Sequence, residues 1–222
     1  MDDNRVRPAR ESDLEALVHL HARAFPDFLL TLLGPAFLRE LYRAFMTDAK
    51  GLALVALDAN CDAVVGAVAG TTDPSTFFRG LLRRRAFAFT WAALPALCRH
   101  PLRVARRMLA ALFYRGETPP QLPDAALLSS LAVEPSTQGQ GVGARLVEAF
   151  CIQVSARGAR YVYLTTDEAG NDRGNTFYAR CGFSVLTHLT RADGRLMNLY
   201  YRSVSDGRTA PKENAGTMPI RQ

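Results

Sequence analysis

The sequence predicts a domain of the α+β class (α/β-type), and three observations lead to this prediction. Of the 222 residues, 48% are hydrophobic and 22% are charged, a balance typical of a globular chain. Two apolar runs at residues 52–57 and 63–69 flank a polar turn, Asp58–Asp62, in the manner of a β-hairpin. Elsewhere, segments with apolar residues at helical spacing are interleaved with short strand-like runs. We therefore expect one domain over residues 1–204.

The predicted elements before the hairpin are a short strand at residues 5–9 and two helices. Ser12-x-x-Glu15 has the pattern of a capping box at the start of the first helix, and Gly34-Pro35 begins the second. The apolar faces of these helices consist of Leu14, Leu17, Val18, Ala22 and Phe25, and of Phe37, Leu38, Leu41, Tyr42 and Phe45. His19 and His21 lie on the first helix, where we expect surface or boundary positions.

The excess of positive over negative charge lies in one segment of the chain. The net charge is +6, yet nine arginines and no acidic residue lie between Pro74 and Gly116, leaving 18 basic and 21 acidic residues elsewhere. Residues 74–122 are predicted to form a basic helical insertion of two or three amphipathic helices, broken near Pro95 and Pro101. Three interpretations stay open for residues 74–116: a packed lid with a solvated arginine face, a lid that binds an anionic acceptor, or an interfacial helix pair on a membrane surface. Nucleic acid is disfavoured because no recognised binding fold accompanies the arginines.

The second half of the chain predicts a strand at residues 126–133, a helix to about residue 156, a strand at 161–165 and a helix at Asp172–Cys181. Two terminal strands, residues 183–189 and 196–204, alternate like an antiparallel pair. From residue 205 the chain is polar and without periodicity, so residues 205–222 are predicted to be a disordered tail.

The cysteines and the N-terminal segment bear on the compartment. The four cysteines are far apart and include no CxxC, which predicts neither a disulfide framework nor a metal site. The polar N-terminal segment is unlike a signal peptide, and no apolar stretch reaches the length of a spanning helix. We expect a cytoplasmic protein, with association at a membrane surface left open by the basic segment.

A glycine-rich loop, Gln138-Gly-Gln-Gly-Val-Gly143, connects a predicted strand to a predicted helix. This arrangement favours anion binding, because the first N–H groups of a helix lack intrahelical acceptors. The loop is not a Walker A motif, since no Gly-Lys-Ser/Thr follows. Gly139-x-Gly141-x-x-Ala144 with Asp167 downstream also fits a loose dinucleotide-binding pattern, although its position far into the chain argues against that fold.

Two motifs in order resemble the GNAT superfamily of acyl-CoA-dependent N-acetyltransferases. The first is Leu131-Ala-Val-Glu-Pro135 followed by Gln138-x-x-Gly141-x-Gly143, and the second is Asn171-x-x-Gly174-x-x-Phe177-Tyr178-x-x-Cys181-Gly182-Phe183. The resemblance is good over residues 124–204 and weak over residues 5–72. It implies a mixed, mostly antiparallel central sheet flanked by helices, with the Arg-rich helical insertion between strands 3 and 4.

The resemblance implies direct transfer of an acetyl group from acetyl-CoA, as co-substrate and without a metal, to a primary amine through a tetrahedral intermediate. The acceptor is expected to be a small molecule, an amino sugar or a peptide amine. The alternative is a non-catalytic acyl-CoA-binding or membrane or nucleic-acid interaction module on the same fold. The oligomeric state stays open.

By the same resemblance, backbone N–H groups of the loop would hold the coenzyme A pyrophosphate; the residues are Gln138, Gly139, Gln140, Gly141, Val142, Gly143 and Ala144. Leu131, Ala132 and Val133 would align the pantetheine arm, and Asn171 would hydrogen-bond the pantetheine or the phosphate end of the co-substrate. Tyr178 occupies the position of the family's general acid, and a phenol of pKa about 10 can protonate a thiolate of pKa about 8.5. Ser129 and Ser130 face the site but are not bases, so the general base is left open among Glu134, Asp167 and water.

Overall fold

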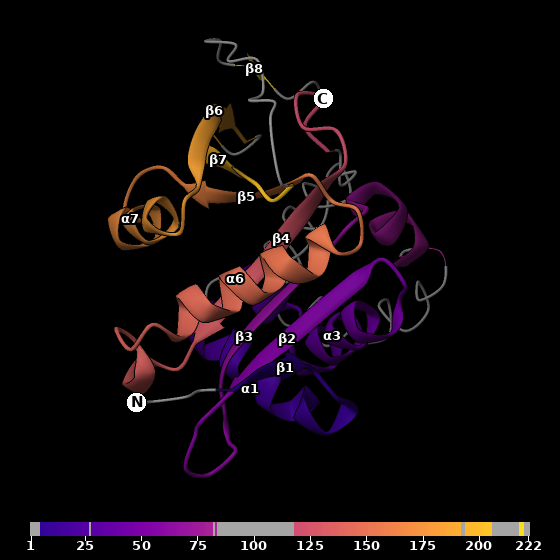
Figure 1. Cartoon of the computed structure of the whole chain (residues 1–222), viewed down its shortest axis with the longest axis vertical. Coiled ribbons are helices and arrows are strands. Elements are labelled where there is room, and N and C mark those ends of the chain that lie inside the picture. The colour runs from indigo at the N-terminus through magenta and orange to yellow at the C-terminus, as the bar shows by residue number, and fades with distance from the viewer. Residues whose placement is uncertain are drawn as a thin grey trace.

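Eight strands form one mixed sheet within the residues that the computed structural model describes, which are 5–26, 28–81, 83, 118–191, 194–205 and 218–219 (Figure 1). The strands are β1 (Val6–Pro8), β2 (Gly51–Leu57), β3 (Val64–Thr71), β4 (Ala125–Val133), β5 (Tyr161–Asp167), β6 (Ser184–Thr190), β7 (Leu196–Ser203) and β8 (Met218–Pro219). Their order is β1-β2-β3-β4-β5-β7-β6-β8. Only the pairs β4–β5 and β6–β8 are parallel in this described part, so the prediction of a mixed, mostly antiparallel sheet is confirmed.

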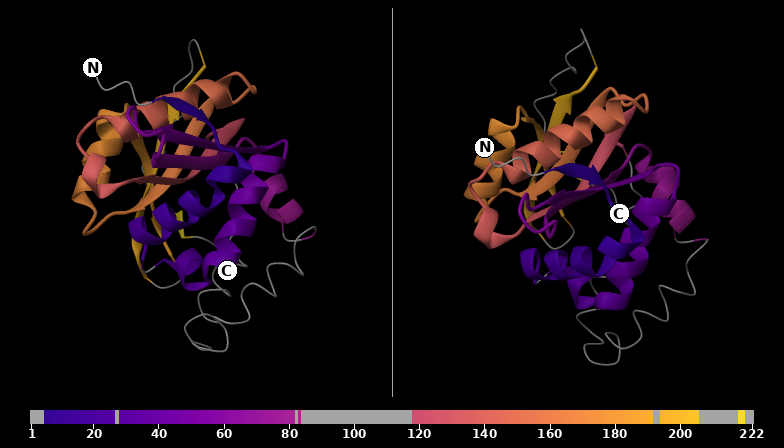
Figure 2. Two further views of the ribbon diagram at one scale, coloured as in Figure 1. Left: turned by 90° about the horizontal axis from the view of Figure 1, so that it is seen from below. Right: turned by 60° about the horizontal axis from the view of Figure 1, so that its bottom comes forward.

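Helices cover both faces of this sheet. They include α1 (Leu14–Ala24), α2 (Leu29–Leu32), α3 (Pro35–Thr47), α6 (Val142–Ser155) and α7 (Asp172–Arg180), and residues 74–81, at the start of the predicted basic insertion, are helical as well. Figure 2 shows α6 on one face and α1 and α3 on the other. The four-residue helix α2 is too short to show a period and was not expected from the sequence. Residues 84–117, which hold most of the predicted basic helical insertion, and 206–217, most of the predicted tail, lie outside the described residues.

The apolar residues of β2 explain why helices pack on both faces of the sheet. All seven of its residues are buried. Leu52, Leu54 and Ala56 pack in the core beneath α6, while Ala53, Val55 and Leu57 pack in the core beneath α1 and α3. Because successive side chains of a strand point to opposite faces, an uninterrupted apolar run is stable only between two helical layers.

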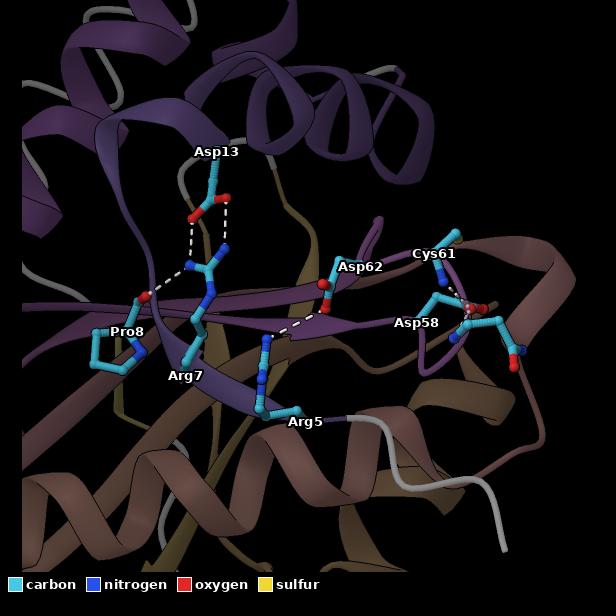
Figure 3. Close-up of polar contacts among 8 residues, drawn as sticks. Arg5, Arg7, Pro8, Asp13, Asp58, Cys61 and Asp62 are labelled. Carbon is cyan, nitrogen blue, oxygen red and sulfur yellow. Dashed lines mark hydrogen bonds and ion pairs between the residues drawn. The ribbon is translucent and has the colours of Figure 1, made fainter.

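The first helix begins differently from the predicted capping box. The Asp13 carboxylate accepts two hydrogen bonds from the Arg7 guanidinium, at 2.6 and 2.9 Å (Figure 3). It also accepts the backbone N–H of Arg10 at 2.7 Å. Glu15 instead reaches outward to Arg39, at 2.7 Å. The Ser12–Glu15 prediction is wrong because the buried Asp13, in the short 3₁₀ turn Glu11–Asp13, provides the contact that fastens the helix start to β1.

The predicted hairpin is confirmed, and its turn is held by side chains. The Asp58 carboxylate accepts the N–H groups of Asn60 and Cys61 at 2.8 and 3.3 Å, which is how an aspartate stabilises a turn. Arg5 donates to Asp62 at 3.2 Å across the surface (Figure 3).

The middle of the sheet is divided by a fork. Strands β4 and β5 pair only from Ala125 with Tyr161 to Leu127 with Tyr163 and then diverge (Figure 1). We call residues 128–133 of β4 and 164–167 of β5 the β4–β5 fork. Opposite β3, Ala69 pairs with Ser130 and Gly70 with Leu128, so the exposed Ser129 is the extra residue of a β-bulge. The bulge lies at the point where the two strands separate.

Candidate functional site

The glycine loop ends at α6 with backbone N–H groups available to an anion. Gly141 is the N-cap residue and has φ of 77°, in the left-handed region that favours glycine. Within the described part of the chain, no acceptor bonds the N–H groups of Gly139 or of residues 141–144. The N–H groups of Gln138 and Gln140 are used in the preceding turn, with Pro135 and Thr137 as acceptors. The N-terminus of α6 adds its dipole, so this loop has the donors and the field that bind phosphate.

Arg145 places a positive charge at the same loop. It is not among the binding residues predicted from the sequence. Its guanidinium donates to the Gln140 carbonyl at 3.3 Å, and its Nη1 lies 3.8 Å from where a Cβ on Gly141 would stand. Gln138, which opens the loop, donates its side-chain amide to the Val133 carbonyl at 3.3 Å. The signal that could have found Arg145 is an arginine one turn into a helix that follows a glycine loop.

The two sequence motifs meet at Gly143. A Cβ on Gly143 would stand 3.2 Å from Cζ of Phe177 on α7 and 3.5 Å from Cγ2 of Val133 on β4. The absence of a side chain at Gly143 therefore lets α7 pack against the first turn of α6 and the end of β4. The structure thus brings together segments that are about 30 residues apart in the sequence.

Tyr178 lies in this contact region. Its ring centroid is 5.2 Å from that of Phe177, 5.8 Å from that of Phe183 and 6.2 Å from that of Tyr200. The ring packs on the core beneath α6, as do Leu131 and Val133 of the fork. Burial raises the pKa of Tyr178 well above its usual value, because the phenolate would lose its hydration. The hydroxyl therefore stays protonated at neutral pH and can act as a donor.

Asn171 and Asn175 shape the start of α7. Asn171 is the N-cap residue, and its side-chain Oδ1 lies 2.6 Å from where a Cβ on Gly174 would stand. Asn175 accepts the hydroxyl of the buried Thr166 at 2.7 Å and donates to the carbonyls of Asp167 and Glu168 at 3.3 and 3.2 Å. Asn175 was missed from the sequence, although an asparagine inside a helix is a signal because its propensity there is poor. It fastens α7 to the end of β5.

Both carboxylates considered as general base are engaged by arginines. Glu134, directly after β4, lies 2.6 Å from Arg23 of α1. Asp167, at the end of β5, lies 3.4 Å from Arg195. Strand β5 extends to Asp167, beyond its predicted end, because Asp167 still pairs with Met197 of β7.

On the face of the sheet covered by α1 and α3, Ser130 reaches a buried polar pair. The Ser130 hydroxyl lies 3.4 Å from the Tyr42 hydroxyl, which lies 2.9 Å from Nδ1 of His21. Burial lowers the pKa of His21 to about 4 and raises the pKa of Tyr42 to about 12. The expectation of a surface or boundary position is wrong for His21, which is 3% exposed, because its face of α1 packs against α3.

The described residues hold no group of three or more His, Cys, Asp or Glu side chains placed to bind a metal ion. They also hold no helix with the length and apolar character needed to cross a membrane.

Residues 14–183 match the family model described as "Acetyltransferase (GNAT) family". Similar solved structures include Ard1 from Thermoplasma volcanium, with 16% identity over 91% of this chain and 99% of that one and a TM-score of 0.57. An aminoglycoside 6'-N-acetyltransferase complexed with coenzyme A has 14% identity over 92% and 99% of the two chains and a TM-score of 0.59. The yncA protein of Salmonella typhimurium, solved with its cofactor acetyl-CoA, has 13% identity over 94% and 97% and a TM-score of 0.59.

At these identities the structural likeness shows the fold alone, and no curated protein matches the sequence. The family model, by contrast, spans more than half of the chain and both motifs that meet at Gly143. The chain therefore belongs to the GNAT acetyltransferase family.

Proposed function

We propose that this chain transfers an acetyl group from acetyl-CoA directly to a primary amine of a small molecule, an amino sugar or a peptide. The observation that carries the proposal is the meeting of the glycine loop, the end of β4 and the helix of Tyr178 around Gly143. Two structurally similar proteins hold coenzyme A or acetyl-CoA, as their descriptions state. The non-catalytic alternative keeps the binding loop but needs no proton donor at Tyr178.

The loop is suited to the pyrophosphate of the co-substrate. The N–H groups of Gly139 and residues 141–144 supply donors at the positive end of the α6 dipole, and Arg145 adds a full positive charge. Leu131, Ala132 and Val133 lie along the fork, where β4 no longer pairs with β5. Their free strand edge is suited to the amide groups of a pantetheine arm.

Tyr178 supplies the proton at the end of the reaction. When the neutral amine attacks the thioester carbonyl, a tetrahedral intermediate forms, and its carbon–sulfur bond then breaks. Tyr178 donates its proton to the leaving thiolate, and backbone N–H groups at the fork stabilise the oxyanion. Since Arg23 and Arg195 engage Glu134 and Asp167, we assign acceptance of the amine proton to water at the fork.

Binding of acetyl-CoA tests the first half of the proposal. At 100 times its dissociation constant, a ligand of the native state stabilises the fold by about 2.7 kcal/mol. We expect a rise in the midpoint of thermal unfolding with acetyl-CoA and none with NAD at the same concentration. A shift with NAD alone would favour the dinucleotide-binding interpretation of the loop and contradict the proposal.

Turnover tests the second half. Coenzyme A release should be measured with glucosamine, kanamycin, spermidine and a peptide with a free N-terminal alanine. Because general acid catalysis contributes at least about 100-fold, Tyr178→Phe should lower kcat by about that factor and leave the dissociation constant of acetyl-CoA unchanged. Tyr201→Phe, on β7, is the matched control. Tight binding of acetyl-CoA without release of coenzyme A in the presence of any of these amines would support the non-catalytic alternative.

A further inference from the structure

A hydrogen-bonded chain of three polar side chains runs from the fork into the core. Ser130 on β4 contacts Tyr42 on α3 at 3.4 Å, and Tyr42 contacts His21 on α1 at 2.9 Å. Tyr42 and His21 are 2% and 3% exposed, whereas Ser130 is only partly buried. The chain therefore has one end at the fork and the other in the core.

Ser130 lies on the face of the sheet opposite to Tyr178. Leu128 and Leu131 pack in the core beneath α6, and Ala132 packs in the core beneath α1 and α3. By strand alternation Ser130 shares the face of Ala132, in agreement with its contact to Tyr42. Tyr178 packs on the core beneath α6. The proton donor for the thiolate and the Ser130 hydroxyl therefore approach the fork from opposite faces of the sheet.

The direction of the hydrogen bonds depends on the protonation of His21 and Tyr42. Desolvation keeps His21 neutral and keeps the proton on Tyr42, because neither charged form is hydrated in the core. With the proton of the neutral ring on Nε2, Nδ1 accepts the Tyr42 hydroxyl proton, and the Tyr42 oxygen accepts the Ser130 hydroxyl proton. The two lone pairs of the Ser130 oxygen are then left as acceptors.

We propose that the Ser130 hydroxyl receives the acceptor amine by accepting a hydrogen bond from its N–H, with Tyr42 and His21 acting as positioning residues for that hydroxyl. The inference rests on the proposed function and adds to it the residue that orients the nucleophile. A hydroxyl acceptor of this kind suits a neutral amine, whose lone pair stays free for attack on the thioester. It requires no transfer of a proton to His21.

Steady-state kinetics with the fastest amine of the panel test this assignment. Ser130→Ala and Tyr42→Phe should raise the KM of the amine about tenfold and leave the dissociation constant of acetyl-CoA unchanged, because the loop is on the other face. Ser130→Thr keeps the hydroxyl and should restore most of the lost affinity. Ser129→Ala removes the neighbouring hydroxyl, for which no bond to Tyr42 exists among the described residues.

The outcomes separate this inference from the proposed function. A wild-type chain that binds no acetyl-CoA contradicts the function itself. The inference alone is overturned if the wild-type chain turns over and Ser130→Ala leaves the KM of the amine unchanged. The same holds if Ser130→Ala raises this KM no more than Ser129→Ala does. Thermal unfolding of each variant without ligand shows whether a change in KM accompanies a loss of folding.

The direction of the chain is tested without any amine. In the full-length protein labelled with ¹⁵N-histidine, the His21 signal is identified as the one missing in His21→Gln. At pH 7 we expect a neutral ring with a proton on Nε2 and none on Nδ1, and a displaced Nδ1 signal in Tyr42→Phe. A ring protonated on Nδ1 would make Tyr42 a donor toward Ser130 and overturn the proposed orientation.

Discussion

Asp13 shows how one carboxylate fixes the relation between a strand and a helix. It bonds Arg7 of β1 through both oxygens and also accepts the N–H of Arg10 before α1. The hydrogen bond from Arg7 lowers the pKa of Asp13, although burial acts in the opposite direction. The pair differs from Arg5–Asp62 nearby, whose side chains are 67% and 79% exposed.

Asp13→Asn should therefore destabilise the fold by about 2 kcal/mol, since Arg7 would stay partly buried without its counter-charge. Arg5→Gln, which removes an exposed pair, should change the free energy of unfolding by less than about 0.5 kcal/mol. Urea unfolding at pH 7 measures both. Equal effects of the two variants would contradict the assigned role of Asp13.

The arginine partners of Glu134 and Asp167 could not be predicted from the sequence. Glu134 follows β4 directly, as predicted, whereas Asp167 is the last residue of β5 and does not lie after it. Their ion pairs with Arg23 and Arg195 involve partners 111 and 28 positions away in the chain. No local pattern encodes such a pairing, because it depends on how α1 packs on the sheet and on how β7 pairs with β5.

At the scale of elements, the contact of α6 with α7 is set by the missing side chain of Gly143. Helix α7 carries Tyr178 and is fastened at one end by Asn175 to β5 and in the middle by Phe177 to Gly143. Two independent contacts thus fix the orientation of a helix of nine residues. The motif spacing predicted that these segments would serve one site, but not that Phe177 would be the contact.

Gly143→Leu should displace the Phe177 ring, because a Cβ at this position would already stand 3.2 Å from its Cζ. Overpacking of this kind costs about 1–3 kcal/mol. Phe177→Leu in the same chain should recover part of that loss, since it removes the opposing ring. Ala144→Leu is the control, because Ala144 is exposed on the next position of α6. Urea unfolding compares the variants, and a double variant less stable than the sum of the two single changes would contradict the contact.

At the scale of the whole molecule, the fork follows from the order of the strands. Strand β4 remains paired with β3 to its end, while β5 pairs along its whole length with β7. Each strand is therefore held by its outer neighbour, and the two parts of the sheet diverge where their mutual pairing stops. Tyr178 of α7 packs on the core beneath α6, and Ser130 of the fork contacts Tyr42 of α3 on the other face of the sheet.

The folding equilibrium of the whole molecule should depend on pH through His21. The folded state lowers the pKa of His21 to about 4, whereas the unfolded chain keeps a value near 6.5. Between these values the unfolded state binds more protons, so acid favours unfolding. The stabilisation that neutral His21 provides is complete above pH 6.5 and is lost as the pH falls toward 4.

Lowering the pH from 7 to 5 should reduce the free energy of unfolding by roughly 2 kcal/mol through this one group. The glutamine of His21→Gln does not titrate, so the free energy of unfolding of this variant should fall by roughly 2 kcal/mol less than that of the wild type between pH 7 and pH 5. Urea unfolding of both proteins at the two pH values gives the difference. Parallel losses in the two proteins would show that His21 is not the responsible group.

The order of the elements, the hairpin, the glycine-rich loop and the family motifs follow from the sequence, because each depends on residues close together in the chain. Periodicity records which face of a helix or strand is apolar, and glycine spacing records where the backbone must turn. The boundaries of β2, β3, β4 and α6 accordingly lie within a few residues of their predicted positions.

Which polar groups meet depends instead on how the elements pack. His21, read as a surface or boundary residue, is buried against Tyr42, and Tyr42 meets Ser130 at a separation of 88 positions. Asp13, and not the predicted capping box of Ser12, fastens the start of α1, because Arg7 of β1 lies beside Asp13. In each case the partner comes from another element, and its distance is set by the packing of helices on a sheet that no local pattern describes.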